Sequence, residues 1–459
     1  MSGKDDGIST LANGFDRRSF LATATALGAA TLIPACAPAT PVTASKRIPA
    51  MDGLNGFVEE GWGPVADILR ANLKEGRDLG ASCAVYVDGR PVVNVWGGLA
   101  DKAANRPWQE DTVALVASTT KGAAAFCANL LAQRGQLDMD APVTRYWPEF
   151  GQAGKEDVPV RYLLSHQVGL PYTDTVVTFE DLRAWHPAIR ALEVQKPLWT
   201  PGTEHMYHAV TYGFLVGEIV RRVTGKTLGT FFQEEIARPL KLSAWIGLPE
   251  EIEPRVATVE QEPYPENFMG AMVADFAKVM GWEVPIAVEV IKTMYGPGTD
   301  FFKAGQFGGF NGENVGSRAY RAMEFPGGNM FTNAHSLARM YGATVAEVDG
   351  FRLLTPETVA KMTEIQTVNS RMHGAPPELE PYARKMFNMS LGFHRPNSSM
   401  LPLLGPASFG HPGSGGSLGA GDPDSRVGFG YVPNLWAAKM IDMRQIELTN
   451  AVRKCLGKA

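Results

Sequence analysis

Cysteine is scarce in this chain, and the few cysteines follow no metal-binding pattern. Four occur among 459 residues, namely Cys36, Cys83, Cys127 and Cys455. No Cys-x-x-Cys pair and no histidine cluster with metal-ligand spacing is present, which argues against a zinc site. We therefore expect neither a metal nor an organic cofactor, and the spacing of the cysteines assigns no disulfide.

A strong charge of either sign is also lacking. Lys and Arg total 43 and Asp and Glu total 48, which gives a formal net charge of -5. Basic runs with interleaved aromatic residues are missing, so nucleic acid is not an expected partner. With 45% apolar and 20% charged residues, the composition is that of an ordinary globular protein.

The uncharged run near the N-terminus is too short to cross a bilayer comfortably. It spans residues 20–35, whereas a spanning helix needs about 20 apolar residues. The run follows Arg17-Arg18 and precedes small residues, a pattern typical of a twin-arginine export signal. We expect residues 1–39 to be this signal, and residues 40–54 to be a linker.

Two processing routes fit the end of this signal. Ala37-Pro38-Ala39 resembles a signal-peptidase site, whereas Ile33-Pro34-Ala35-Cys36 resembles a lipobox that would make Cys36 a lipid anchor. Both routes predict a bacterial protein exported to the periplasm or anchored at its membrane.

Hydrophobic patterning beyond the linker predicts an α+β fold, with an antiparallel sheet flanked by helices. Residues 57–75 have helical spacing, and the Asp88-Gly89 turn joins two β-rich runs. Further strands are expected at 389–394, 407–411, 417–421 and 427–432, with helices at 121–134, 210–222, 334–345 and 437–456. Two N-terminal strands alone are marginally stable, so the first and last segments must share one sheet. We predict an α/β domain over 55–137 and 326–459, interrupted by a helical domain over 138–325.

Ser118-Thr119-Thr120-Lys121 opens the helix expected at 121–134. Residues three apart lie on one helix face, so the Ser118 hydroxyl and the Lys121 amine are within reach of each other. The helix N-terminus also favours developing negative charge. A serine becomes nucleophilic when a base accepts its proton, which makes Ser118 a candidate nucleophile. Taken alone, the tetrapeptide equally describes a helix cap followed by a solvated lysine.

Two further segments contain candidate catalytic or substrate-binding groups. Trp199-Thr200-Pro201-Gly202 is a turn that leads to Tyr207, a phenol that can act as a base only if a cation such as Lys121 lowers its pKa. The run from His411 to Ser417 is rich in glycine and allows a ligand to approach the backbone closely. Its N–H groups, together with that of Ser118, would make an oxyanion hole.

Ser118-x-x-Lys121, Tyr207 and His411-x-Gly413, in this order, resemble the motifs of the serine β-lactamase superfamily. The chain is most similar to its class C-like and penicillin-binding-protein-like hydrolases, and within these to the family VIII carboxylesterases. The likeness covers roughly residues 55–455 and includes Leu163 to Pro171 and the Trp199 turn.

The resemblance implies a role for each motif residue. Ser118 would be acylated, Lys121 would hold the proton network and lower the pKa of Tyr207, and Tyr207 would take the Ser118 proton. Ser414 would supply the second oxyanion N–H, following the strand motif that ends at Gly413. His411 would lie near the carboxylate or ester oxygen of the substrate.

Two departures from the β-lactamase pattern shift the expected substrate. Ala209 stands where class C enzymes have the Asn of Tyr-x-Asn, and His411-Pro412-Gly413 replaces Lys-Thr-Gly. Both changes remove groups that hold a lactam, so we predict a serine carboxylesterase acting on a small neutral ester. The alternatives are a β-lactamase, a D-alanyl peptidase or an acyltransferase acting on an ester or amide, and a binding or sensor protein without turnover.

Two other candidates compete with these assignments. Gly415-Gly416-Ser417-Leu418-Gly419 matches the nucleophile elbow of α/β-hydrolases, but that motif needs a parallel strand and a helix. The flanks here indicate an antiparallel hairpin. His166 could form a Ser-His dyad, although its Leu-Leu-Ser-His setting is more typical of a structural histidine.

Overall fold

The computed structural model describes residues 46–458, except for 51, 264–265, 297, 310–314, 397–400 and 440. The predicted export signal, including Arg17, Arg18 and Cys36, lies outside the described residues. Residues 45–459 form one compact unit. The division into an α/β and a helical domain remains a prediction.

The main sheet combines strands from both ends of the chain, as the sequence predicts. Its order is β1-β2-β4-β3-β14-β13-β12, and every neighbouring pair is antiparallel. The bounds are β1 (Arg47–Pro49), β2 (Leu54–Glu59), β3 (Gly80–Val87), β4 (Arg90–Asp101), β12 (Phe409–Pro412), β13 (Leu418–Asp422) and β14 (Val427–Pro433). The α+β expectation is therefore confirmed.

The centre of the sheet is where the two ends meet. Asp88 and Gly89 have φ values of 48° and 77°, as the tight turn of the β3–β4 hairpin requires. Strand β14 pairs along the other edge of β3, from Val427 opposite Val87 to Pro433 opposite Ala81. The N-terminal strands β1 to β4 thus continue through β14 into the C-terminal strands, and one sheet results.

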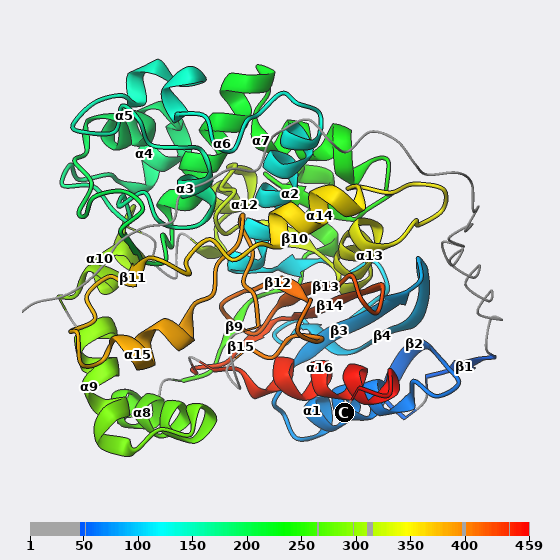
Figure 1. The fold of residues 1–459 in the computed structure, drawn as a ribbon. Coiled ribbons are helices and arrows are strands. Elements are labelled where there is room, and N and C mark those ends of the chain that lie inside the picture. Colours follow the sequence, from blue (N-terminus) through cyan, green and yellow to red (C-terminus); the bar gives the residue numbers. More distant parts are fainter. Residues whose placement is uncertain are drawn as a thin grey trace, which may run out of the picture. The chain divides into compact units, whose positions relative to one another are not determined.

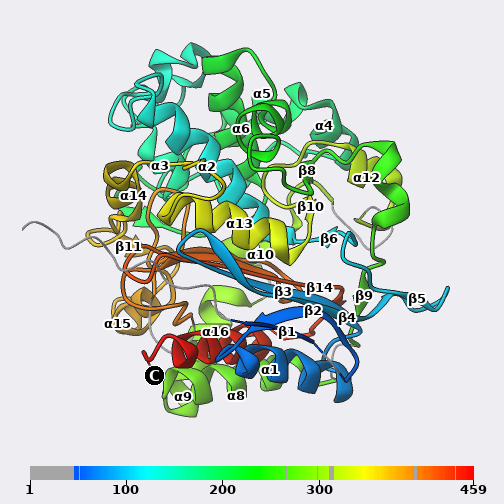
Figure 2. The same ribbon diagram turned by 90° about the vertical axis from the view of Figure 1, so that its right-hand side faces the viewer.

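Helices cover both faces of this sheet (Figures 1 and 2). Helices α1 (Gly63–Lys74) and α16 (Met443–Cys455) lie on one face, and α13 (Ala334–Val345) lies on the other. A Cβ on Gly428 would be 2.2 Å from the Ala338 carbonyl oxygen, so this glycine is what allows α13 to lie so close to β14.

Most of the remaining elements lie around α2 (Thr120–Gln133). The segment that carries α8 to α10 lies on the same side of the molecule as α15 (Figure 1). Short strands β6 (Ala114–Leu115), β10 (Met330–Thr332) and β8 (Ala244–Ile246) make a second sheet. The helices are α3 (Arg161–Leu164), α4 (Phe179–Ala184), α5 (His186–Val194), α6 (Thr211–Thr224), α7 (Leu228–Phe232), α8 (Phe268–Met280), α9 (Val284–Tyr295), α10 (Asp300–Gln306), α12 (Arg318–Ala322), α14 (Pro356–Thr363) and α15 (Glu380–Ala383). Among the described helices, none is both long and apolar enough to cross a membrane.

Several element boundaries differ from the sequence-based expectation. Strand β1 forms within the stretch predicted as a linker, and β2 occupies the start of the helix predicted at 57–75. The strand expected at 389–394 is reduced to two isolated bridges, one between Met389 and His394 and one between His394 and Gly410. Helix α16 begins at Met443 because the Asp442 carboxylate caps it, accepting the Arg444 N–H at 3.0 Å.

Candidate active site

Ser118 lies in a 3-10 turn, Ala117–Thr119, that leads directly into α2. The turn is strained, because Ala117 has a φ of 43°, a value that non-glycine residues seldom adopt. It is held by the Thr120 hydroxyl, which donates to the Ala117 carbonyl at 2.5 Å and accepts the Met330 N–H of β10 at 2.8 Å. The surrounding structure therefore fixes the position of the Ser118 side chain.

Lys121 is completely buried on the first turn of α2. Its Nζ donates to the Ser118 Oγ at 3.2 Å, to the Ala209 carbonyl at 2.8 Å and to the Gly327 carbonyl at 2.6 Å. No carboxylate is bonded to this amine among the described residues, and burial lowers its pKa to about 7. The solvated lysine that the tetrapeptide also allows is thus excluded. The ammonium makes all three bonds, and the neutral amine can keep the two bonds to the carbonyls while its lone pair accepts a proton from the Ser118 hydroxyl.

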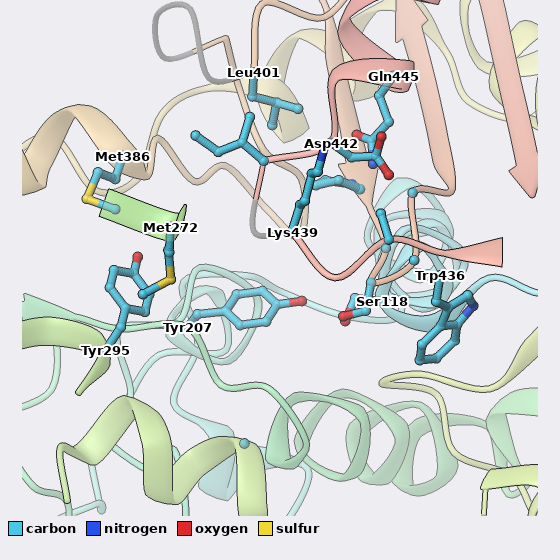
Figure 3. Close-up of a pocket in the computed structure, with 18 of the residues that line it drawn as sticks. Ser118, Tyr207, Met272, Tyr295, Met386, Leu401, Trp436, Lys439, Asp442 and Gln445 are labelled. Carbon is cyan, nitrogen blue, oxygen red and sulfur yellow. The ribbon is translucent and has the colours of Figure 1, made fainter. Parts of the chain in front are cut away.

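Tyr207 lies beside Ser118 in the cavity lining. Figure 3 shows its hydroxyl pointing toward Ser118, to which it is hydrogen-bonded. Burial raises the pKa of this phenol above its ordinary value, and the bond to Ser118 offsets only part of that effect. The expected lowering of the Tyr207 pKa by Lys121 is therefore wrong, because desolvation of the phenol is the dominant effect. A phenol with a raised pKa stays protonated near neutral pH, so Tyr207 is not available there as a phenolate base.

The glycine-rich turn between β12 and β13 packs directly against the Ser118 turn. A Cβ on Gly413 would lie 2.3 Å from the Val116 carbonyl oxygen, so only glycine permits this approach. The turn's own bonds use the N–H groups of Gly413 and Gly416, which donate to Ser417 and Gly413. The N–H of Ser414 takes no part in them, and the N–H of Ser118 precedes the first bond of its 3-10 turn. These two N–H groups are the candidate oxyanion donors.

His411 is buried and neutral. Its Nδ1 lies 2.7 Å from the Pro412 carbonyl, which can only accept, so Nδ1 carries the proton and Nε2 is a bare acceptor. Burial holds its pKa well below the usual range, and His394 and Lys121 lower it further. The position that holds a lysine in β-lactamases therefore has no fixed positive charge here.

His394 is a site residue that sequence reasoning missed. It lines the cavity, and its ring lies 4.8 Å from that of His411 and 6.2 Å from that of Tyr207. Burial, aided by the positive charge of Lys121, lowers its pKa to about 3. No local motif marks this position, because His394 reaches the site through its pairing with Gly410 beside His411.

Arg444, in the first turn of α16, is hydrogen-bonded to the glycine-rich turn. Its guanidinium donates to the Gly415 carbonyl at 2.9 Å, to Asp78 at 2.8 Å and to Asp442 at 2.6 Å. Asp78 also accepts the Tyr431 hydroxyl at 2.7 Å. This buried network joins α16 and β14 to the turn that carries the Ser414 N–H.

The structure assigns the two competing candidates to structural positions. The buried Ser417 hydroxyl donates to the Val116 carbonyl at 2.8 Å, and the antiparallel β12–β13 pairing lacks the geometry of a nucleophile elbow. The His166 Nδ1 accepts the His208 N–H at 3.1 Å, and the His166 ring packs against Tyr207 rather than lining the cavity. Neither residue contacts the Ser118 hydroxyl among the described interactions.

Ser118 and Tyr207 open into one cavity of about 820 Å³. Its described lining also includes His394, His411, Gly413 and Ser414, so five of the six predicted site residues line a single space. The sixth, Lys121, is buried behind Ser118 and bonded to its hydroxyl oxygen. Across the described chain, no group of three or more His, Cys, Asp or Glu side chains is arranged to hold a metal ion. Cys83, Cys127 and Cys455 are free thiols.

Comparison with known proteins agrees with this geometry. The family model "Beta-lactamase" matches residues 65–449. A protein of Mycobacterium tuberculosis described as esterase/beta-lactamase LipL is 34% identical over 381 residues, covering 79% of each chain.

Solved structures show the same likeness. A family VIII carboxylesterase superimposes with a TM-score of 0.73 at 32% identity, covering 88% of this chain and 100% of that one. A penicillin-binding protein homolog from Caulobacter crescentus gives a TM-score of 0.70 at 31% identity, with the same coverage.

Proposed function

Because the chain belongs to the Beta-lactamase family, we propose that it hydrolyses neutral carboxylic esters through an acyl-enzyme on Ser118. The observation that carries this proposal is the contact between the Ser118 Oγ and the buried amine of Lys121, at 3.2 Å. An amine with a pKa of about 7 is the base that a serine hydroxyl needs near neutral pH.

The acylation half begins when the Ser118 oxygen attacks the ester carbonyl carbon and its proton moves to the Lys121 Nζ. The carbonyl oxygen becomes an anion that accepts from the N–H groups of Ser118 and Ser414. The proton then passes from Lys121 through the Tyr207 hydroxyl to the departing alcohol oxygen. The alcohol leaves, and the acyl group stays on Ser118.

The deacylation half reverses the proton path. A water molecule attacks the acyl carbon and gives its proton to the Tyr207–Lys121 pair, and the Ser118 oxygen leaves and regains a proton. The sum is one ester and one water converted to one acid and one alcohol. The carbonyls of Ala209 and Gly327, bonded to the Lys121 Nζ, hold the amine in place while its charge changes.

The preference for an ester over a lactam depends on His411. A β-lactam carboxylate is held best by a fixed cation, and His411 is neutral with a bare Nε2. β-Lactam or D-alanyl peptide cleavage is the second candidate, and the names of the LipL relative and the penicillin-binding protein homolog favour it. Acyl transfer to an alcohol would use the same intermediate.

The test compares a p-nitrophenyl butyrate assay with a chromogenic cephalosporin assay in the wild type, Ser118→Ala and Ser417→Ala. We expect efficient ester turnover by the wild type and a loss of about 1,000-fold or more in kcat for Ser118→Ala. Ser417→Ala is the matched control, and it should keep most of the activity. Fast cephalosporin turnover without ester turnover would overturn the ester assignment. A single stoichiometric burst with no turnover would indicate a sensor.

We also propose that the protein is exported, and that Arg17 and Arg18 direct this export. Support comes from the arginine pair before the apolar run at 20–35 and from the small residues that follow it. Replacing both arginines with lysine should leave the protein in the cytoplasm of an expressing bacterium, as measured by cell fractionation. A Cys36→Ser variant separates the two processing routes, since only a lipoprotein would lose its membrane fraction. Unchanged export of the double lysine variant would contradict the proposal.

A further inference from the structure

The cavity beside Ser118 has an extended apolar wall. Large apolar and aromatic side chains from α8, α9, α10 and the segment after α15 line it, among them Met272, Phe276, Tyr295, Phe301 and Met386. In the view of Figure 3, Met272, Tyr295 and Met386 lie on one side of the Tyr207 ring and Ser118 on the other. The cavity volume of about 820 Å³ is typical of sites for drug-sized molecules, far larger than an acetyl group needs.

Charge is nearly absent from this cavity. Among its described lining residues, two are charged, Lys439 and Asp442. The Asp442 carboxylate is paired with Arg444 at 2.6 Å, and Lys439 is exposed to solvent, which screens its charge. A charged substrate group placed against the apolar wall would lose its hydration without gaining a partner there.

We propose that this wall binds the acyl group of the ester, and that the preferred acyl group is a medium-length or aromatic hydrocarbon without charge. This inference rests on the proposed ester hydrolysis. The acyl group remains on Ser118 after the alcohol has left, so it is the part of the substrate that must be held through the second half of the reaction. Each methylene moved from water onto the wall strengthens transition-state binding by about fourfold.

Gly305 on α10 offers a way to fill the cavity without disturbing the core. It lines the cavity, and a Cβ built on it would meet no atom within 4 Å. A Gly305→Leu variant therefore adds a side chain beside the wall, and leucine favours the helix more than glycine does. Gly316→Leu is the matched control, because Gly316 is exposed, has equally open surroundings and does not line the cavity.

The experiment measures kcat/KM for p-nitrophenyl acetate, butyrate, octanoate and benzoate, together with the valerate and the negatively charged hemiglutarate. Alkyl acetates of increasing alcohol length form a second series. In the wild type we expect octanoate to exceed acetate by about tenfold or more, and valerate to exceed hemiglutarate by a similar factor. Gly305→Leu should lower octanoate turnover by about tenfold while acetate stays within about twofold, and Gly316→Leu should change neither.

Failure of this inference is distinguishable from failure of the proposed function. Ser118-dependent hydrolysis that is fastest with acetate, that depends on alcohol length alone, or that responds equally to Gly305→Leu for all esters would overturn the acyl-wall assignment and leave the esterase intact. A lack of Ser118-dependent turnover of any ester would overturn both.

Discussion

At the scale of the residue, burial assigns the proton-transfer roles. Lys121 is fully buried with two carbonyls as its closest partners, so desolvation lowers its pKa to about 7. The same burial raises the pKa of Tyr207. Desolvation opposes the charged form of either group, so it favours a neutral amine on Lys121, which can accept a proton, and keeps the Tyr207 phenol protonated.

The pH dependence of ester hydrolysis should follow Lys121. The neutral amine is the active form, so kcat/KM should rise as the pH rises through about 7 and then level off. The pKa of His394 is lowered to about 3 and that of His411 is also far below the usual range, so neither should add a step near neutrality. The measurement is a pH–rate profile with p-nitrophenyl butyrate, corrected with Ser118→Ala.

Lys121→Arg provides the contrast, because a guanidinium keeps its proton across this range. It should lose about 1,000-fold in kcat and show no rise near neutral pH. An acidic limb centred several pH units below 7 in the wild type would contradict the assignment of Lys121 as the base.

At the scale of the element, the glycine-rich turn depends on a distant helix for its position. Arg444 at the start of α16 donates to the Gly415 carbonyl and is itself held by Asp78 and Asp442. The Ser414 N–H belongs to the same turn. A small displacement of this turn would move a candidate oxyanion donor away from the nucleophile without altering the Ser118 turn.

Arg444→Lys should therefore lower kcat by about 100-fold with little change in KM, because an oxyanion donor acts mainly in the transition state. The substitution keeps a positive charge beside Asp78 and Asp442, but a single ammonium cannot reproduce the fork that also bonds Gly415. Arg453→Lys, on the same helix and far from this turn in sequence, serves as the control. Unchanged kcat in a folded Arg444→Lys protein, as checked by its thermal unfolding, would contradict the positioning role.

At the scale of the whole molecule, the site exists because both ends of the chain build one sheet. Ser118 follows the N-terminal strands, whereas His411 lies in β12 and Ser414 in the turn after it, near the C-terminus. Strand β14 joins them by pairing with β3. The segment that carries α8 to α10 then adds the apolar wall of the cavity.

Local sequence patterns predict much of this arrangement. The Asp88-Gly89 turn, helices α2, α6 and α13, and the ordered motifs around Ser118, Tyr207 and His411 all follow from short-range spacing. Local patterns do not show three features: strand β1, the start of α16 at Met443 rather than at 437, and the position of His394 in the cavity lining. His394 depends on its pairing with Gly410, whereas β1 pairs with the neighbouring β2 and the Asp442 cap sets the start of α16, contacts that hydrophobic patterning does not show.

The sequence by itself predicted the kind of chemistry, because Ser118-x-x-Lys121, Tyr207 and His411-x-Gly413 occur together in the order of the serine β-lactamase motifs. It also determined the absence of a fixed cation at position 411. Only the tertiary structure decided the protonation states favoured for Lys121 and Tyr207 and the shape of the cavity. Desolvation of Lys121 and Tyr207, and the apolar wall built from α8 to α10, depend on which distant side chains exclude water from the site.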